Sequence, residues 1–172
     1  MSSAIIHPFA STSGDFVITR TFDAPRELVF KAWTEVEHLR HWWGPKGAKM
    51  EKSELDARPG GWFHYGLTKP FEMWGRWMIR EVTPPERLVF VNSFSDPDGG
   101  LARHPLHLEW PAELLTTVTF VEEAGKTTVT IRWTPINPSE TERRTFDNNH
   151  DSMNQGWGGT LDQLVEHLRG AR

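Results

Sequence analysis

The sequence has 172 residues, a net charge of −4 and no cysteine. This length is enough for one domain with a sizeable core, and the lack of a basic excess argues against a nucleic-acid-binding surface. The lack of cysteine excludes disulfides, thiol nucleophiles and thiolate metal sites. No segment approaches the roughly 18 apolar residues of a membrane span, and no secretory signal is recognisable. We therefore expect a cytoplasmic protein without membrane contact.

Aromatic residues are the unusual feature of the composition. The chain contains nine tryptophans, ten phenylalanines and one tyrosine. Such side chains fill protein cores, and they also line pockets that take small molecules. We expect most of the tryptophans to be core packing and a minority to contact a ligand.

The first 14 residues are rich in serine, threonine and small side chains. This composition predicts a flexible N-terminus at residues 1–14, followed by a single domain at residues 15–170. Residues 15–22 then form a β-branched run that is typical of a strand.

Two short helices are predicted after this strand. Pro25 suits the first turn of a helix, and the apolar face that follows continues to Trp33. Thr34 and Glu37 have the spacing of a capping box, in which a hydroxyl and a carboxylate satisfy the first amides of a helix. They predict a second helix that stops at residues 44–45, a Gly-Pro pair.

Residues 48–94 have the pattern of consecutive antiparallel strands joined by short loops. Period-two alternation predicts strands at residues 50–55, 62–67, 71–80 and 87–94. On these strands Phe63, Tyr65, Trp77, Phe90 and Asn92 share the apolar phase. We expect these side chains to point toward the interior, where the polar atoms of Tyr65 and Asn92 need partners from a ligand or from neighbouring groups.

Residues 95–113 break this rhythm with three prolines, a Gly-Gly pair, two histidines and a tryptophan. A loop this long in a compact domain is functional or mobile, and we interpret it as the lid of a pocket. Two further strands, at residues 115–122 and 127–134, are predicted to form a hairpin.

The same loop contains residue types that bind zinc, namely His104, His107 and Glu109. Their spacing fits no compact zinc motif, and Pro105 bends the chain between the histidines. We therefore expect a solvent-facing segment and no metal site.

The last predicted element is a long helix. Residues 145–168 place one apolar stripe at helical spacing, formed by Phe146, His150, Met153, Trp157, Leu161, Leu164 and Leu168. Ser139 and Glu142 have capping-box spacing, so the helix should begin near Glu140. Glycines at 156, 158 and 159 interrupt it at about 1 kcal/mol each relative to alanine, and we attribute them to close backbone packing around Trp157.

One strand, two short helices, about six strands and one long helix indicate the α+β class, an antiparallel sheet with its long helix on one face. Several segments, in this order, also resemble one known family. They are residues 23–25, 29–33, 42–45, 56–61, 85–90, 156–157 and 161–164, which read DAP, VFKAW, WWGP, DARPGG, PERLVF, GW and LDQL.

The family these segments resemble is related to the C-terminal domain of the activator of the heat-shock-protein-90 ATPase. It lies within the START, birch-pollen-allergen and polyketide cyclase (SRPBCC) superfamily. The resemblance spans residues 15–168 and implies a helix-grip fold, in which a curved antiparallel sheet wraps around the C-terminal helix and leaves a cavity. The superfamily includes lipid carriers, hormone receptors, cyclases and co-chaperone domains, so the fold alone does not select a function.

Our first hypothesis is a small-molecule binding protein, rather than an enzyme, with an apolar aromatic-lined cavity for a hydrophobic or aromatic ligand. It needs no cofactor and no metal, and the protein is a monomer or a homodimer. The predicted ligand-binding residues are Phe63, Tyr65, Trp77, Phe90, Asn92, His150, Met153 and Trp157.

Two alternatives remain open. One is an enzyme of the cyclase or dehydratase type that uses the same cavity, with His150 as general acid or base. The other is a co-chaperone-like module that binds the chaperone itself. The chain shows no nucleophile elbow, phosphate loop, metalloprotease helix or dinucleotide fingerprint that would point to another chemistry.

Overall fold

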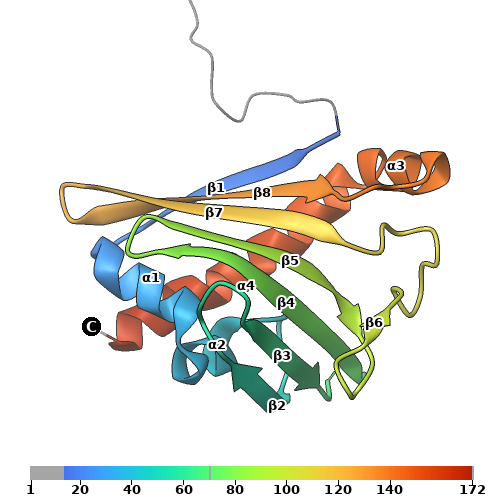
Figure 1. Ribbon diagram of the computed structural model, residues 1–172. Coiled ribbons are helices and arrows are strands. Elements are labelled where there is room, and N and C mark those ends of the chain that lie inside the picture. The colour runs from blue at the N-terminus through green and yellow to red at the C-terminus, as the bar shows by residue number, and fades with distance from the viewer. Residues whose placement is uncertain (1–13, 70, 172) are drawn as a thin grey trace, which may run out of the picture.

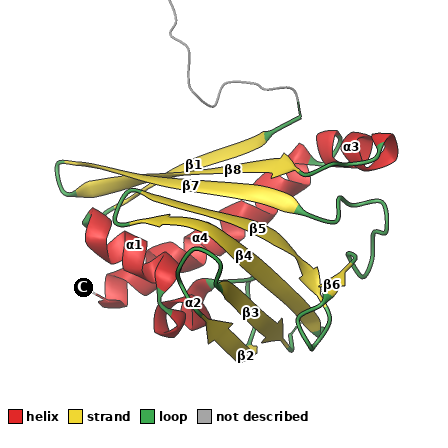
Figure 2. Ribbon diagram, in the orientation of Figure 1, coloured by secondary structure: helices red, strands yellow, loops and turns green. Residues whose placement is uncertain are grey.

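A curved antiparallel sheet is wrapped against one long helix. The computed structural model describes residues 14–69 and 71–171, so all but the last residue of the predicted flexible terminus lies outside it. The sheet has eight strands, seven of them in the order β1-β8-β7-β5-β4-β3-β2, while β6 pairs with β5. Helix α4 crosses one face of this sheet from end to end (Figures 1 and 2). The predicted helix-grip architecture and α+β class are confirmed.

The strands follow the predicted order closely. Their bounds are β1 Phe16–Phe22, β2 Met50–Leu55, β3 Trp62–Leu67, β4 Met73–Thr83, β5 Arg87–Ser95, β6 Leu101–Ala102, β7 Leu114–Glu123 and β8 Lys126–Pro135. The only strand without a sequence-based prediction is β6, two residues long, which lies inside the long loop. Every strand pair is antiparallel, and short connections join β3 to β4 and β4 to β5. Their register pairs Phe63 with Trp77 and Trp77 with Asn92 across the strands.

Helices α1 (Arg26–Thr34) and α2 (Val36–Trp42) follow β1 (Figure 1). Helix α2 packs against the C-terminal half of α4, while α1 contacts α2 and strands β7 and β8. The predicted capping box of Thr34 and Glu37 is wrong, because Thr34 is the last residue of α1. Its hydroxyl donates back to the carbonyl of Phe30 at 2.9 Å. The residue that precedes α2 is Glu35, whose side chain caps no amide.

The predicted single C-terminal helix is two helices, α3 (Glu140–Asp147) and α4 (His150–Ala171). The capping box at Ser139 and Glu142 is confirmed. The break falls at Asn148 and Asn149, where the Asn149 amide donates to the carbonyl of Thr145 at 2.6 Å. Asparagine side chains compete with the backbone for such bonds, which is a local cause for ending a helix.

The attribution of the α4 glycines to close packing is also wrong. A Cβ added at Gly156, Gly158 or Gly159 would meet no other atom within 4 Å. The absence of side chains here therefore leaves open space beside the helix rather than permitting close contact.

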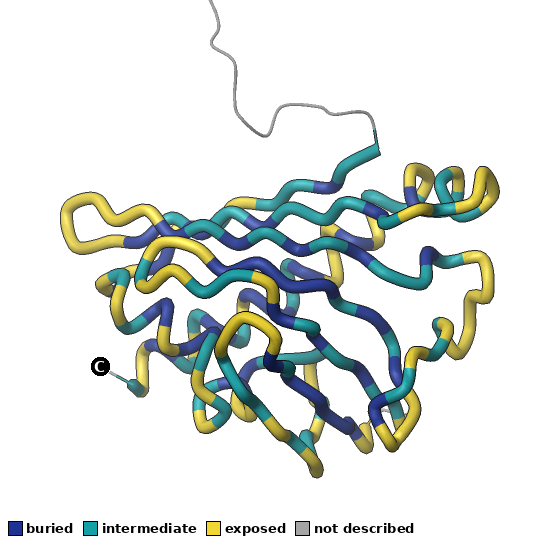
Figure 3. The backbone as a smooth tube through the Cα atoms, in the orientation of Figure 1, coloured by how far each residue is buried: buried dark blue, intermediate teal, exposed yellow. Residues whose placement is uncertain are grey.

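The core lies between the sheet and the helices, as the buried inner segments of Figure 3 show. Trp33 is its centre, fully buried and in ring contact with Trp42, Trp77, Phe120 and Trp157. Trp33, Trp42 and Trp77, three of the nine tryptophans, are thus fully buried core packing at this end of the molecule. Among the described residues, no helix combines the length and apolarity that crossing a bilayer requires.

Candidate ligand-binding cavity

One hollow in the structure lies at the other end of α4. This cavity of about 590 Å³ is bounded by the inner face of the sheet, the first half of α4, the loop before β7 and the connection between α2 and β2. On the helix side its wall is Ser152, Met153, Gly156, Trp157 and Thr160, which follow one another at helical spacing. The cavity falls in the size range of sites that take small organic molecules.

Four of the eight predicted ligand-binding residues line this cavity. Tyr65, Asn92, Met153 and Trp157 are all part of its wall. The alternation of the strands and the stripe of α4 therefore place these four side chains around one space.

The other predicted strand residues lie behind the wall. Phe63, Trp77 and Phe90 are almost completely buried, and Trp77 stacks on Phe90 with ring centroids 4.0 Å apart. Trp43, which does line the cavity, packs edge-on against Trp77 at 5.0 Å. Phe63, Trp77 and Phe90 therefore face inward as predicted, but the interior around them is filled by other side chains.

His150 is not part of the cavity wall. Its ring packs between Phe16 and Phe146, with centroid distances of 5.7 and 5.4 Å. Its Nε2 atom is buried and has no hydrogen-bond partner among the described residues. The candidate general acid or base of the enzyme hypothesis is therefore enclosed by aromatic rings rather than placed at the space a substrate would occupy.

Tyr65 is held at the wall by its neighbours on both sides. It pairs across the strands with Gly75, and its hydroxyl lies so close over that residue that a Cβ there would be 2.3 Å from Oη. The indole of Trp43 donates a hydrogen bond to Oη, and burial raises the pKa of Tyr65 to about 12. The phenol therefore keeps its proton at neutral pH.

Asn92 is oriented by a buried hydroxyl. Thr116, with no exposed surface, donates to Oδ1 of Asn92 at 2.7 Å. The Nδ2 group makes no hydrogen bond with another described residue. The amide thus presents its donor end unpaired in a residue that lines the cavity.

The long loop also contributes to the wall, through His104, His107 and Trp110. The expectation of a purely solvent-facing segment is wrong for His104, whose ring is half-buried against Phe94 at 4.7 Å. Its Nδ1 accepts the backbone N–H groups of Leu106 and His107 at 3.0 and 3.2 Å. Burial, and then the nearby His107, lower the pKa of His104. Within the described chain no group of three or more potential metal ligands is positioned to hold an ion.

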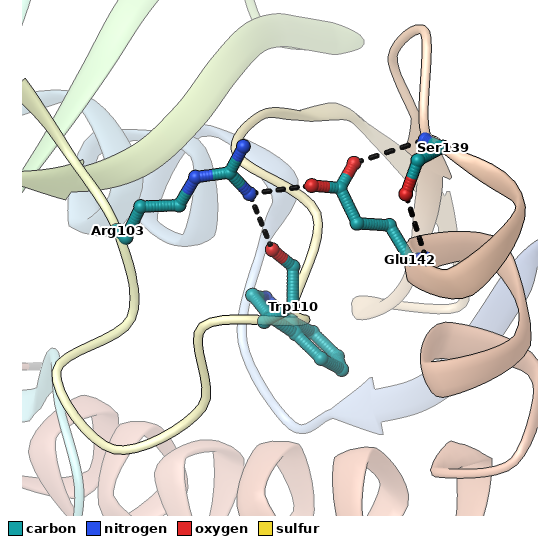
Figure 4. Close-up of polar contacts among 4 residues, drawn as sticks. All are labelled: Arg103, Trp110, Ser139 and Glu142. Carbon is teal, nitrogen blue, oxygen red and sulfur yellow. Dashed lines mark hydrogen bonds and ion pairs between the residues drawn. The ribbon is translucent and has the colours of Figure 1, made fainter.

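The loop is fastened over the cavity by one charged pair, shown in Figure 4. Arg103 donates to a carboxylate oxygen of Glu142 at 2.5 Å and to the carbonyl of Trp110 at 3.2 Å. The other carboxylate oxygen of Glu142 accepts the backbone N–H of Ser139 at 3.0 Å, completing the capping box of α3. The Ser139 N–H and the Arg103 guanidinium lower the pKa of Glu142. We call Arg103, Trp110 and Glu142 the loop latch.

Sequence reasoning missed three tryptophans of the wall, Trp43, Trp110 and Trp133. The first two lie in connections, which have no periodicity to reveal their direction. Trp133 lies on a strand and shares the phase of Val129 and Ile131, so period-two alternation signals an inward position but not whether the space there is filled.

A curved antiparallel sheet wrapped around a long helix defines a helix-grip domain. The chain belongs to the family described as activator of Hsp90 ATPase homolog 1-like protein, whose model matches residues 23–169. This family is the one that the sequence segments resembled. No curated protein matches the chain.

Solved structures of similar proteins share this fold. Protein Ms6760 from Mycobacterium smegmatis is 24% identical with a TM-score of 0.72, and the match covers 90% of each chain. A protein from Arthrobacter aurescens is 26% identical with a TM-score of 0.72, over 91% of this chain and 86% of that one. The AHSA1 protein from Silicibacter pomeroyi is 20% identical with a TM-score of 0.66, over 92% and 99% of the two chains.

Proposed function

We propose that the protein binds a hydrophobic or aromatic small molecule in the cavity between the sheet and α4. The observation that carries the proposal is the composition of the wall, in which Trp43, Trp110, Trp133 and Trp157 converge on one space of about 590 Å³. Aromatic side chains left facing a space lose the contacts that a packed core would supply. A flat apolar ligand would restore those contacts by stacking against the indoles.

The position of His150 weighs against the cyclase or dehydratase alternative in its original form. A general acid or base must come within about 3 Å of the proton it transfers, directly or through one water. His150 is not among the residues that line the cavity, and its ring packs between Phe16 and Phe146. For the co-chaperone alternative, the family name is the support, and no feature of the described surface favours it over ligand binding.

Native mass spectrometry of protein purified from its own cells, before and after denaturation, tests the proposal. A discrete added mass that is lost on denaturation is the expected result. A mass matching the bare chain, with no shift after addition of aromatic and fatty compounds, would overturn it.

Two glycine variants give this experiment a matched pair. Gly156 is part of the cavity wall, whereas Gly159 is one turn further along the same helix and outside the wall. A Cβ at either position would meet no neighbouring side chain within 4 Å, and leucine has a better helix propensity than glycine, so both variants should fold. Gly156→Leu should reduce the bound mass several-fold and Gly159→Leu should not. Equal retention by both variants would place the ligand elsewhere.

A further inference from the structure

Three polar wall residues on the sheet and loop side of the cavity, Tyr65, Asn92 and His104, share one property. In each of them an acceptor atom is already bonded within the protein, and a donor hydrogen remains. Asn92 is the clearest case, because the buried Thr116 hydroxyl occupies Oδ1 and fixes the amide with Nδ2 unpaired. A donor fixed in this way is ready to bind without reorganising.

His104 repeats the arrangement in the loop. Its Nδ1 is occupied by two backbone N–H groups, so the neutral ring carries its hydrogen on Nε2. Burial keeps the pKa of this ring below its ordinary value, which favours the neutral form with that single N–H donor.

Tyr65 and Trp133 add to the same surplus. The Tyr65 oxygen accepts the indole hydrogen of Trp43, and the phenol proton is retained. Trp133 has a donor only, and its buried Nε1 meets no acceptor among the described residues. Donors therefore outnumber free acceptors on this side of the cavity.

Charge is missing from the same wall. None of the described residues that line the cavity is an aspartate, glutamate, lysine or arginine. Arg103, the nearest basic residue in the loop, is held outside the wall by the latch. An ionised ligand group would lose hydration here and gain no counter-charge, which disfavours its binding.

We infer that the cavity selects an uncharged aromatic ligand bearing a hydrogen-bond acceptor, such as an aryl ketone, quinone or lactone carbonyl. The inference rests on the proposed function and specifies its ligand class. A ligand acceptor pairs with wall donors that a hydrocarbon ligand would leave unpaired. A donor hydrogen on a ligand hydroxyl or amine would find the acceptor atoms of Asn92, His104 and Tyr65 already bonded within the protein.

Three probes of nearly equal shape test the inference: 2-acetylnaphthalene, 2-isopropenylnaphthalene and 2-naphthoate. They carry a carbonyl, the isosteric alkene and a carboxylate on the same ring system. In equilibrium dialysis the ketone should bind about tenfold more tightly than the alkene, as expected for one or two neutral hydrogen bonds, and the carboxylate should bind least.

Variants then assign the preference to the donors. The double variant Asn92→Leu with Thr116→Val removes the Nδ2 donor without leaving a buried hydroxyl unpaired, and it should cut the ketone preference to about threefold or less. Asn154→Leu, the same substitution at an exposed α4 position outside the cavity wall, is the control and should leave the preference intact.

The possible failures are distinguishable. Equal binding of ketone and alkene, or tightest binding of the carboxylate, would overturn the inference while leaving the cavity a binding site. A preference that survives the double variant would also overturn the role of Asn92. Failure of all three probes to bind, with no bound mass in the native protein, would overturn the proposed function and the inference with it.

Discussion

Arg103 in the loop before β7 and Glu142 in the first turn of α3 are 39 residues apart in sequence and form one ion pair. Glu142 takes part in two structures at once, because the same carboxylate completes the cap of α3 and holds the loop. Its side chain is only 14% exposed, so solvent screens this pair less than it screens the other ion pairs of α3. The position of the cavity lid is therefore tied to the start of a helix.

Removing the latch should free the loop without unfolding the domain. We expect Arg103→Ala to raise amide hydrogen exchange in residues 103–110 by about fivefold, since one partly buried ion pair contributes on the order of 1 kcal/mol. The global free energy of unfolding should change by less than about 1 kcal/mol. The control is Arg144→Ala, which removes an exposed pair with Glu140 on the same helix. Identical loop exchange in the two variants would contradict the latch.

Acid should release the same loop. Hydrogen bonds from Ser139 and Arg103 hold the pKa of Glu142 below its ordinary value of 4.5. Because the folded-state pKa is depressed, the stabilisation is fully present above about pH 4.5 and is lost as the pH falls through the folded-state pKa. Loop exchange, corrected for its intrinsic pH dependence, should increase below that pH in the wild type. In Glu142→Gln the increase should be absent, and its persistence would show that another group titrates.

A second pH effect should arise where α2 meets the end of α4. His167 lies within 2.8 Å of His38, Nε2 to Nδ1, and stacks on His41 at 5.3 Å. Burial first, and then His38 and His41, hold the pKa of His167 below its ordinary value of 6.5. Unfolded protein therefore takes up this proton at a higher pH, so stability falls as the pH drops from about 6.5 toward the folded-state pKa.

Urea denaturation at about pH 7.5 and pH 5.5 measures this effect. The wild type should lose stability between the two values, and His167→Phe should lose clearly less because its side chain does not titrate. Glu35, whose carboxylate lies 3.7 Å from Nε2 of His38, is present in both proteins. An equal loss in the variant would mean that His167 is not responsible.

Gly75 should tolerate no side chain while Tyr65 is present. Its Cβ would lie 2.3 Å from the Tyr65 hydroxyl, and displacing that ring would break its bond with Trp43. Gly75→Ala should cost about 1–3 kcal/mol of unfolding free energy, as overpacking does. Adding Tyr65→Leu should recover part of the loss, which would appear as non-additivity in a double-mutant cycle. Strict additivity would mean that the two residues do not interact in this way.

The sequence predicted the fold more completely than the site. Period-two alternation places Tyr65 and Asn92 on the inner face, and helical spacing does the same for Met153 and Trp157, because these patterns report which way a side chain points. These patterns do not report whether the interior beside a given side chain is filled by other residues. Trp77 points inward like Asn92, but the space in front of Trp77 is occupied by Trp43. Trp43 lies in a connection, where no periodicity predicts this contact.

The missed latch and the helix break have the same kind of cause. The Arg103–Glu142 pair joins a loop to a helix, and no local pattern predicts such a long-range contact. The break at Asn148 and Asn149 is local, but its signal is a hydrogen bond from the Asn149 side chain, and the apolar stripe continues through the same residues. Hydrophobic periodicity extends across the break and conceals it.

The four tryptophans of the cavity wall should make the intrinsic fluorescence of the protein sensitive to ligand binding. Trp33, Trp42 and Trp77 are fully buried, and their emission should stay nearly constant when the cavity fills. Trp43, Trp110, Trp133 and Trp157 would exchange contact with open space for contact with a ligand, so the emission maximum and quantum yield should follow occupancy. With a single tyrosine in the chain, located in the same wall, the intrinsic fluorescence that responds to binding comes from the cavity itself.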